Sequence, residues 1–91
     1  MDPIRIPILD VLDLHTFHPR DIAHLIEDYI EECRRLGFRS VRIIHGKGTG
    51  AQKKRVQELL RRNPGVRAFK DAPAEAGGWG ATLVELQRAD Y

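Results

Sequence analysis

Apolar residues recur every three or four positions between Pro19 and Leu36, which is the spacing of an amphipathic helix with one buried face. The stripe consists of Ile22, Leu25, Ile26, Tyr29, Ile30, Cys33 and Leu36. Proline suits the first position of a helix, and Gly37 stands where helices commonly end. A second helix is predicted over residues 51–62, and its inward-facing residues are Val56, Leu59 and Leu60.

Four short apolar runs predict β-strands, at residues 11–14, 40–44, 66–70 and 81–86. Residues 1–8 hold two prolines, so we expect an extended arm outside a domain formed by residues 9–91. The order βαβαββ predicts a two-layer α/β sandwich, with a four-stranded mixed sheet and both helices on one face. The helical crossovers make the first three strands parallel, and the fourth returns antiparallel.

Three glycine- or histidine-bearing segments are predicted to meet at one edge of this sheet. They are Asp13-Leu14-His15, the turn from His45 to Gly50, and Gly77-Gly78-Trp79-Gly80. The carboxyl ends of parallel strands share an edge, and open α/β sheets bind ligands there. We therefore expect one composite site.

The middle segment has the order of an anion site, because it joins an apolar strand to the start of a helix. Its glycines let the backbone bend tightly, and the first amides of the next helix point outward with the positive end of the helix dipole. The spacing is neither the dinucleotide fingerprint nor the nucleoside-triphosphate loop. The residues expected to hold a phosphate are Gly46, Lys47, Gly48, Thr49 and Gly50.

The composition describes one small globular domain. With 91 residues, 42% hydrophobic and 31% charged, the chain can build one core but not two. No apolar run approaches the roughly 20 residues of a membrane span, and the amino terminus lacks a signal-peptide pattern. We expect a cytoplasmic, monomeric protein without membrane contact. The single cysteine, Cys33, excludes an internal disulfide, and its place on the helix stripe predicts a buried, inert thiol.

The net charge of +2 conceals a strong asymmetry along the chain. Residues 37–70 contain ten Lys and Arg against one Glu, and the segments on either side are net negative. A basic segment around a glycine turn is typical of a polyanion binder, although a solvated basic helix face has the same composition. Lys53, Lys54 and Arg55 are candidate phosphate contacts without sequence readout.

The three converging segments also resemble the motifs of a known family. Leu12-Asp13-Leu14-His15, His45-Gly46-Lys47-Gly48-Thr49-Gly50 and Gly77-Gly78-Trp79-Gly80-Ala81-Thr82 are similar, in that order, to the motifs of the Smr (small MutS-related) domain. The resemblance covers roughly residues 9–86 and is that of a stand-alone Smr protein. It implies a fold like the C-terminal domain of translation initiation factor three. It also implies nicking or endonucleolytic cleavage of DNA or RNA, and for some members an association with ribosomes.

One position departs from the family pattern. The first motif usually reads Leu-Asp-Leu-His-Gly, and Thr16 stands in the place of that glycine. A β-branched residue does not easily adopt positive φ, so we expect a differently shaped loop after His15.

The chemistry available at the composite site is acid–base chemistry. An imidazole exchanges protons near neutral pH, so His15 and His45 are candidate proton donor and acceptor, and Asp13 is a candidate to orient one of them. The leading hypothesis is an endonuclease in which these three residues carry the cleavage of phosphodiesters. The alternative is a non-catalytic RNA-, DNA- or ribosome-binding module that uses the same basic edge.

Two further features leave alternatives open. Asp13, His15 and His18 are weak candidates for a metal site, with Mg²⁺, Mn²⁺ or Zn²⁺ as the ion, and a divalent cation brought by the substrate is an easier assumption. Trp79, flanked by Gly78 and Gly80, either covers the core or stacks an unpaired base.

Overall fold

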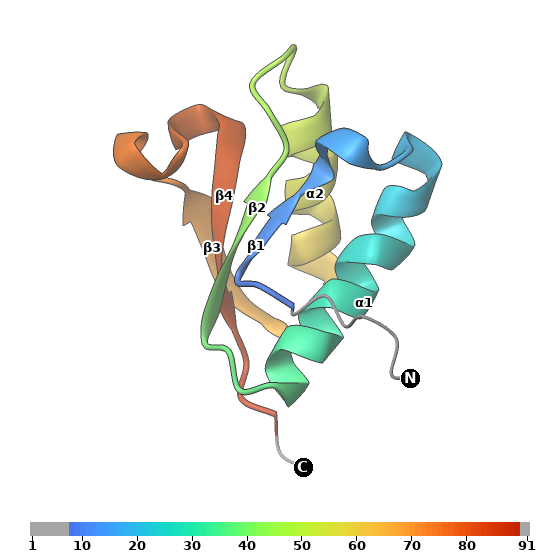
Figure 1. Cartoon of the computed structure of the whole chain (residues 1–91), viewed down its shortest axis with the longest axis vertical. Helices are drawn as coiled ribbons and strands as arrows, with labels where there is room; N and C mark the ends of the chain where they lie inside the picture. Colours follow the sequence, from blue (N-terminus) through green and yellow to red (C-terminus); the bar gives the residue numbers. More distant parts are fainter. Residues whose placement is uncertain (1–7, 90–91) are drawn as a thin grey trace, which may run out of the picture.

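The computed structural model describes residues 8–89, which form two layers. A four-stranded sheet is covered on one face by two helices, as Figure 1 shows. The chain runs through β1 (Val11–Asp13), α1 (Ile22–Arg35), β2 (Ser40–Ile44), α2 (Ala51–Arg62), β3 (Val66–Asp71) and β4 (Ala81–Leu86). The predicted element order and the mixed sheet are therefore confirmed. Most of the predicted arm, residues 1–7, lies outside the described residues.

The strands lie in the order β1-β2-β4-β3. β1 pairs with β2 in parallel, and β4 is antiparallel to both β2 and β3. The first three strands consequently run in one direction, as predicted. The order adds what the sequence did not indicate, namely that the last strand inserts between β2 and β3.

The hydrophobic core lies between the sheet and the helices. The fully buried side chains include Ile22, Ile26 and Ile30 of α1, Val56 and Leu60 of α2, and Ile43 and Val84 of the sheet. Cys33 is also fully buried, as predicted, and burial raises the pKa of its thiol. A thiol in this setting is a packing group.

The first helix differs from its prediction at both ends. Residues Pro19–Asp21 form a separate 3₁₀ turn, so α1 begins at Ile22. Leu36 was predicted on the buried stripe, yet it is 52% exposed. It is the residue after the last helical turn, and the chain reverses at Gly37 with φ +86°, so the stripe ends before it.

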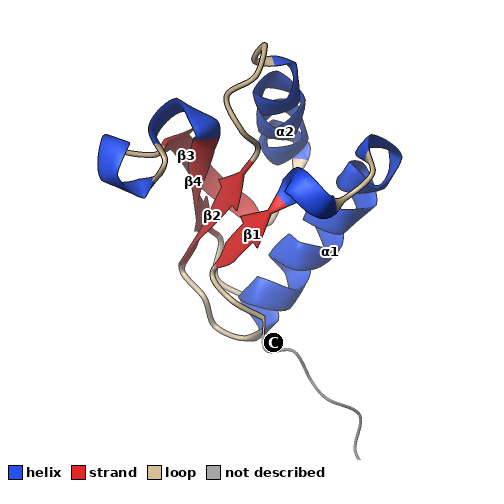
Figure 2. Cartoon of the chain, turned by 45° about the horizontal axis from the view of Figure 1, so that its top comes forward, coloured by secondary structure: helices blue, strands red, loops and turns tan. Residues whose placement is uncertain are grey.

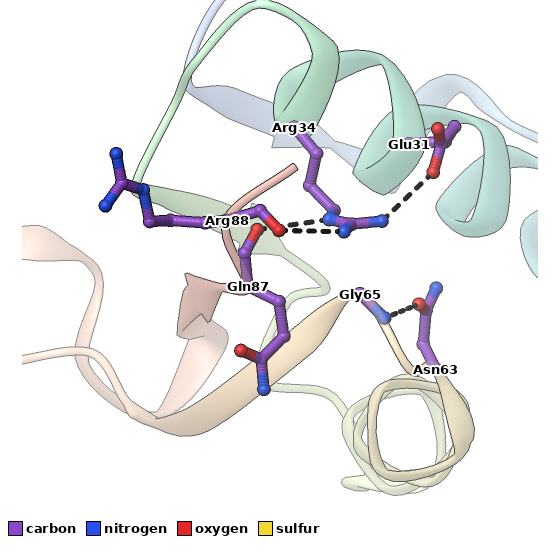
Figure 3. Close-up of polar contacts among 6 residues, drawn as sticks. All are labelled: Glu31, Arg34, Asn63, Gly65, Gln87 and Arg88. Atoms are coloured by element: carbon purple, nitrogen blue, oxygen red, sulfur yellow. Dashed lines mark hydrogen bonds and ion pairs between the residues drawn. The ribbon is translucent and has the colours of Figure 1, made fainter. Parts of the chain in front are cut away.

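The end of the sheet at which β1, β2 and β3 begin is closed by hydrogen bonds (Figure 3). Arg34 of α1 donates from Nε to the carbonyl oxygen of Gln87 (3.1 Å) and from Nη2 to that of Arg88 (3.1 Å). Asn63 accepts a bond from the Gly65 amide (2.8 Å). A Cβ at Gly65 would lie 2.9 Å from Cδ of Arg34, so only glycine fits beneath this side chain.

The opposite end carries the connecting loops. Figure 2 shows the loops after β1 and β3 on either side of the turn that leads from β2 into α2. All three connections leave the same edge of the sheet, as the strand directions require. None of the helices in residues 8–89 is both long and apolar enough to cross a membrane.

Candidate functional site

Asp13 and His15 form a hydrogen-bonded pair at the end of β1. Oδ1 of Asp13 accepts a bond from the backbone amide of His15 (2.9 Å) and another from its ring Nδ1 (2.5 Å). These two hydrogen bonds lower the pKa of the Asp13 carboxyl, and the bond from the backbone amide contributes more than the bond from the ring. Because a carboxylate only accepts, Nδ1 carries the ring proton, and Nε2 of a neutral His15 is a proton acceptor. The pair is accessible, with 65% of the His15 side chain and 55% of the Asp13 side chain exposed.

The accepting nitrogen of His15 faces the glycine turn. A Cβ at Gly46 would lie 3.5 Å from Nε2, and Gly46 has φ +82°. The third segment is bonded to the same place, because the amides of His45 (3.1 Å) and Gly46 (2.9 Å) both donate to the carbonyl of Gly80. The structure therefore brings together the three segments that the sequence placed at this edge.

The predicted phosphate-holding residues form one continuous turn into α2. Gly46, Gly48 and Gly50 all have positive φ, and Gly50 caps the helix with its amide bonded to the carbonyl of Lys47 (3.1 Å). Lys47, Gly48 and Thr49 are exposed. The first amides of α2 have no acceptor within the helix, so the positive end of its dipole faces this turn.

His45 lies in a different environment from His15. It is only 8% exposed, and both ring nitrogens have protein partners. Nδ1 donates to the carbonyl of Gly46 (3.0 Å), which leaves Nε2 of the neutral ring to accept from the hydroxyl of Thr82 (2.8 Å). The sequence predicted that both histidines transfer protons, whereas this bonding favours a role for His45 in holding the turn.

Lys53 is also less accessible than a phosphate contact should be. Its side chain is 10% exposed, and Nζ forms an ion pair with Oδ1 of Asp71 (2.9 Å). This pair is the main cause that lowers the pKa of Asp71. Lys54 and Arg55 remain exposed, although Arg55 donates to the carbonyl of Pro19 (2.8 Å) and so links α2 to the loop after β1.

Trp79 lies at the Gly50 end of the turn, whereas His15 lies at the Gly46 end, and Trp79 is not part of the hydrophobic core. The indole packs against Gly50, where a Cβ would lie 2.9 Å from the ring atom Cη2. Its ring also lies against Lys53, with Nζ 4.1 Å from the ring centroid. About half of the residue (49%) is exposed, so it does not serve as a cover for the core.

The sequence profile of the Smr domain matches residues 12–87. The chain belongs to the Smr domain family. Its relatives include proteins named endonuclease MutS2. The MutS2 of Halalkalibacterium halodurans is 43% identical over 76 residues, covering 84% of this chain and 10% of the relative. That of Thermus thermophilus is 45% identical over 62 residues, covering 68% and 8%. This Smr domain thus spans about a tenth of the length of these relatives.

Two solved structures share the fold. The Smr domain of Thermus thermophilus MutS2 superposes with a TM-score of 0.80 at 38% identity, covering 87% of this chain and 99% of that one. YdaL, a stand-alone small MutS-related protein from Escherichia coli, also gives a TM-score of 0.80, at 27% identity, covering 87% and 65%. The α+β fold of this Smr domain is therefore that of the family.

The loop that departs from the family motif is regular in this Smr domain. Thr16 ends a 3₁₀ turn formed by Leu14–Thr16, and the amide of Phe17 donates to the carbonyl of Leu14 (3.2 Å). Within residues 8–89, positive φ occurs at glycines alone. Threonine therefore fits this loop without backbone strain.

The weak metal candidates are not assembled into a site. Nδ1 of His18 accepts from the amide of Arg20 (3.2 Å), and the Asp13 carboxylate is engaged by His15. Among the residues that the structure describes, no three His, Cys, Asp or Glu side chains are grouped as a metal site would require. His24 is exposed on α1, as its position off the apolar stripe indicated.

Two polar residues of the site were missed by sequence reasoning. Nε2 of Gln57 donates to the Thr82 hydroxyl (3.3 Å) and to Oδ1 of Asp71 (3.3 Å). These hydrogen bonds thus run from the exposed Asp71 through Gln57 and Thr82 to the buried His45. Thr82 was visible as the last residue of the third motif. Nothing in the sequence singled out Gln57 or Asp71, whose contact depends on how β3 and β4 pair.

Proposed function

We propose that this Smr domain cleaves phosphodiester bonds in nucleic acid, with His15 as the group that accepts a proton. The observation that carries the proposal is the Asp13–His15 pair, whose free ring nitrogen faces Gly46. An exposed, carboxylate-oriented imidazole beside an anion-binding turn is the arrangement of a general base. The kinship with the Smr domain of MutS2 supports a nuclease over other acid–base enzymes.

In the proposed reaction, Nε2 of His15 takes the proton of an attacking hydroxyl. The freed oxygen forms a bond to phosphorus, the bond from phosphorus to the leaving oxygen breaks, and solvent protonates the leaving oxygen. The ionised Asp13 stabilises the imidazolium that forms. Lys47 and the amides at the start of α2 stabilise the charge on the phosphoryl oxygens. Water as nucleophile gives a phosphomonoester, whereas an RNA 2′-hydroxyl gives a cyclic phosphate.

The test uses labelled single-stranded RNA and supercoiled plasmid as substrates. His15→Ala should lower the cleavage rate by about 10²- to 10⁴-fold, the usual contribution of a general base. His24→Ala is the matched control, since it removes an exposed histidine on α1 and should leave the rate unchanged. End-group analysis of the products then identifies the nucleophile. Wild-type protein that leaves both substrates intact would rule out the cleavage proposal.

The second candidate function is a non-catalytic module that binds RNA, DNA or the ribosome. The burial of His45, with both ring nitrogens hydrogen-bonded, favours it. Of the two histidines predicted to exchange protons, only His15 is then exposed, whereas acid–base cleavage commonly uses a donor and an acceptor. Such a module would bind nucleic acid in a salt-dependent way through Lys47 and Lys54 and would show no turnover. Titrations of labelled RNA and DNA at two salt concentrations, beside the cleavage assay, separate the two functions.

A further inference from the structure

Trp79 is a surface tryptophan that is contacted from two sides. Nζ of Lys53 lies 4.1 Å from the centroid of the indole ring, and Lys53 is itself fixed by its ion pair with Asp71 (2.9 Å). The ring edge contacts Gly50, where any Cβ would collide with it. Lys53 covers part of one ring face, and the half of the residue that stays exposed offers π-surface to a ligand at a low ordering cost.

A hollow of about 420 Å³ lies between this indole and the first two turns of α2. Its polar lining residues are Thr49, Lys53, Lys54 and Gln57. A flat heterocycle that stacks on the ring would find hydrogen-bonding groups at its edges and a lysine beside it. The surrounding segment, residues 37–70, carries a large excess of positive charge. This complementarity favours a ligand that combines aromatic rings with phosphates.

The hollow adjoins the phosphate-holding turn. Gly80, the residue after Trp79, contacts this turn, since a Cβ there would lie 3.3 Å from Cγ of Lys47. The carbonyl of Gly80 accepts a hydrogen bond from the amide of Gly46, and Gly46 lies beside His15. One strand of nucleic acid that follows this turn would therefore meet His15 beside Gly46 and Trp79 beside Gly50.

We propose that the hollow beside Trp79 is a subsite for one unpaired nucleobase, stacked on the indole next to the phosphate bound at the turn. The substrate is then single-stranded at this point, because a base within a duplex is stacked on both sides and presents only its edges. The subsite rests on the proposed function for the phosphate beside it. The indole sets the preference for unpaired over paired strands, and Asp13 and His15 carry the cleavage.

The experiment exploits the fact that Trp79 is the only tryptophan of the chain. Its fluorescence is followed in His15→Ala protein, which should leave the strand intact, during titration with single-stranded oligothymidylate, the matching duplex and an abasic strand of equal length. Stacking should quench the tryptophan emission with oligothymidylate, and neither the duplex nor the abasic strand should quench it. The abasic strand keeps the phosphates, and it should bind about 10- to 100-fold more weakly without quenching.

Substitutions complete the test through the affinity for a dye-labelled strand. Trp79→Ala should lower the affinity by about 10- to 100-fold, and Trp79→Phe should restore most of it. Leu36→Ala is the matched control, because Leu36 is a similarly exposed apolar residue at the carboxyl end of α1, far from the hollow. It should leave the affinity unchanged. Circular dichroism confirms that each variant is folded, and the oligothymidylate and abasic titrations carry the test if the alanine variant is not.

The outcomes separate this inference from the proposed function. Tight binding of oligothymidylate without quenching, or abasic and base-bearing strands bound equally well, overturns the subsite and leaves cleavage untouched. Quenching and tight binding by a protein that never cleaves would overturn the nuclease proposal and retain the subsite. Equal affinity for the duplex and the single strand would also contradict the preference for unpaired bases.

Discussion

The two ends of the sheet use their polar side chains in opposite ways. At the end where the parallel strands begin, Arg34 donates hydrogen bonds to the carbonyls of Gln87 and Arg88, and Gly65 packs beneath its side chain. At the other end, Asp13 and His15 bond to each other and leave a ring nitrogen directed at the glycine turn. One end is closed for stability, and the other keeps acid–base groups accessible. Substitutions at the two ends should accordingly affect different measurements.

Among the substitutions that compare the two ends, Gly46→Ala should have the largest effect, and it acts on cleavage. The new methyl group would lie 3.5 Å from Nε2 of His15 and would occupy the space of the attacking oxygen, so the rate should fall by about 100-fold or more. Gly37→Ala, between α1 and β2 at the closed end, is the control. It imposes a similar positive-φ strain (φ +86°), but its Cβ meets nothing within 4 Å. Equal rates for the two variants in the cleavage assay would show that His15 Nε2 is not the reacting atom.

The buried half of the site should respond in stability. Thr82→Val removes the hydroxyl that bonds His45 and leaves buried polar atoms unsatisfied, which costs about 2 kcal/mol in the free energy of unfolding. Urea denaturation measures the loss. Thr16→Val, at an exposed position of the same edge, should change the stability by less than about 0.5 kcal/mol. A Thr82→Val protein as stable as the wild type would return His45 to the candidates for proton transfer.

At the closed end, Arg34→Ala should lower the free energy of unfolding by about 1–2 kcal/mol, because two bonds to backbone carbonyls are lost. The cleavage rate should stay the same, since Arg34 lies at the far end of α1. Arg35→Ala, which affects an exposed ion pair with Glu32, is the neighbouring control and should cost less than about 1 kcal/mol. A drop in cleavage with Arg34→Ala under folded conditions would contradict the division between the two ends.

The smallest expected effect is a change in pH dependence. The pKa of Asp71 is lowered below its ordinary value of 3.8, so the ionised carboxylate stabilises the fold above that pH and loses this contribution as the pH falls through the lower folded-state value. Asp71→Asn should therefore melt at a lower temperature than the wild type at pH 5–7, and the difference should shrink below pH 3.8. Glu85→Gln, from an exposed pair with a 3.8 Å separation, should show a smaller difference. Parallel melting curves at every pH would show that the Lys53–Asp71 pair contributes nothing.

The fold could be predicted from the sequence, and so could the segments that meet at the functional end of the sheet, because both follow from local patterns. Periodicity placed the two helices, turn residues bounded the strands, and the parallel crossovers brought Asp13, His15 and the glycine turn together. The burial of His45 could not be predicted, since it depends on Thr82 pairing with Ile43 across the ladder between β2 and β4. That ladder exists only because β4 inserts beside β2. For Lys53 a signal was present, because it shares the inward face of α2 with Val56 and Leu60 at helical spacing.

The length and place of β1 have a consequence for motion. β1 has three residues, stands at the edge of the sheet and pairs with β2 alone. The glycine turn instead follows the central strand β2, and its first amides are bonded to Gly80, the residue before β4. Short edge strands open locally at a lower free energy than central ones, so the amides of β1 should exchange hydrogen with solvent faster than those of β2 and β4. The Asp13–His15 pair thus lies at the end of a strand that opens more easily than its neighbours. An anion that binds at the turn and also contacts His15 would slow this opening. Binding of the substrate phosphate would therefore hold Asp13 and His15 in place for the reaction.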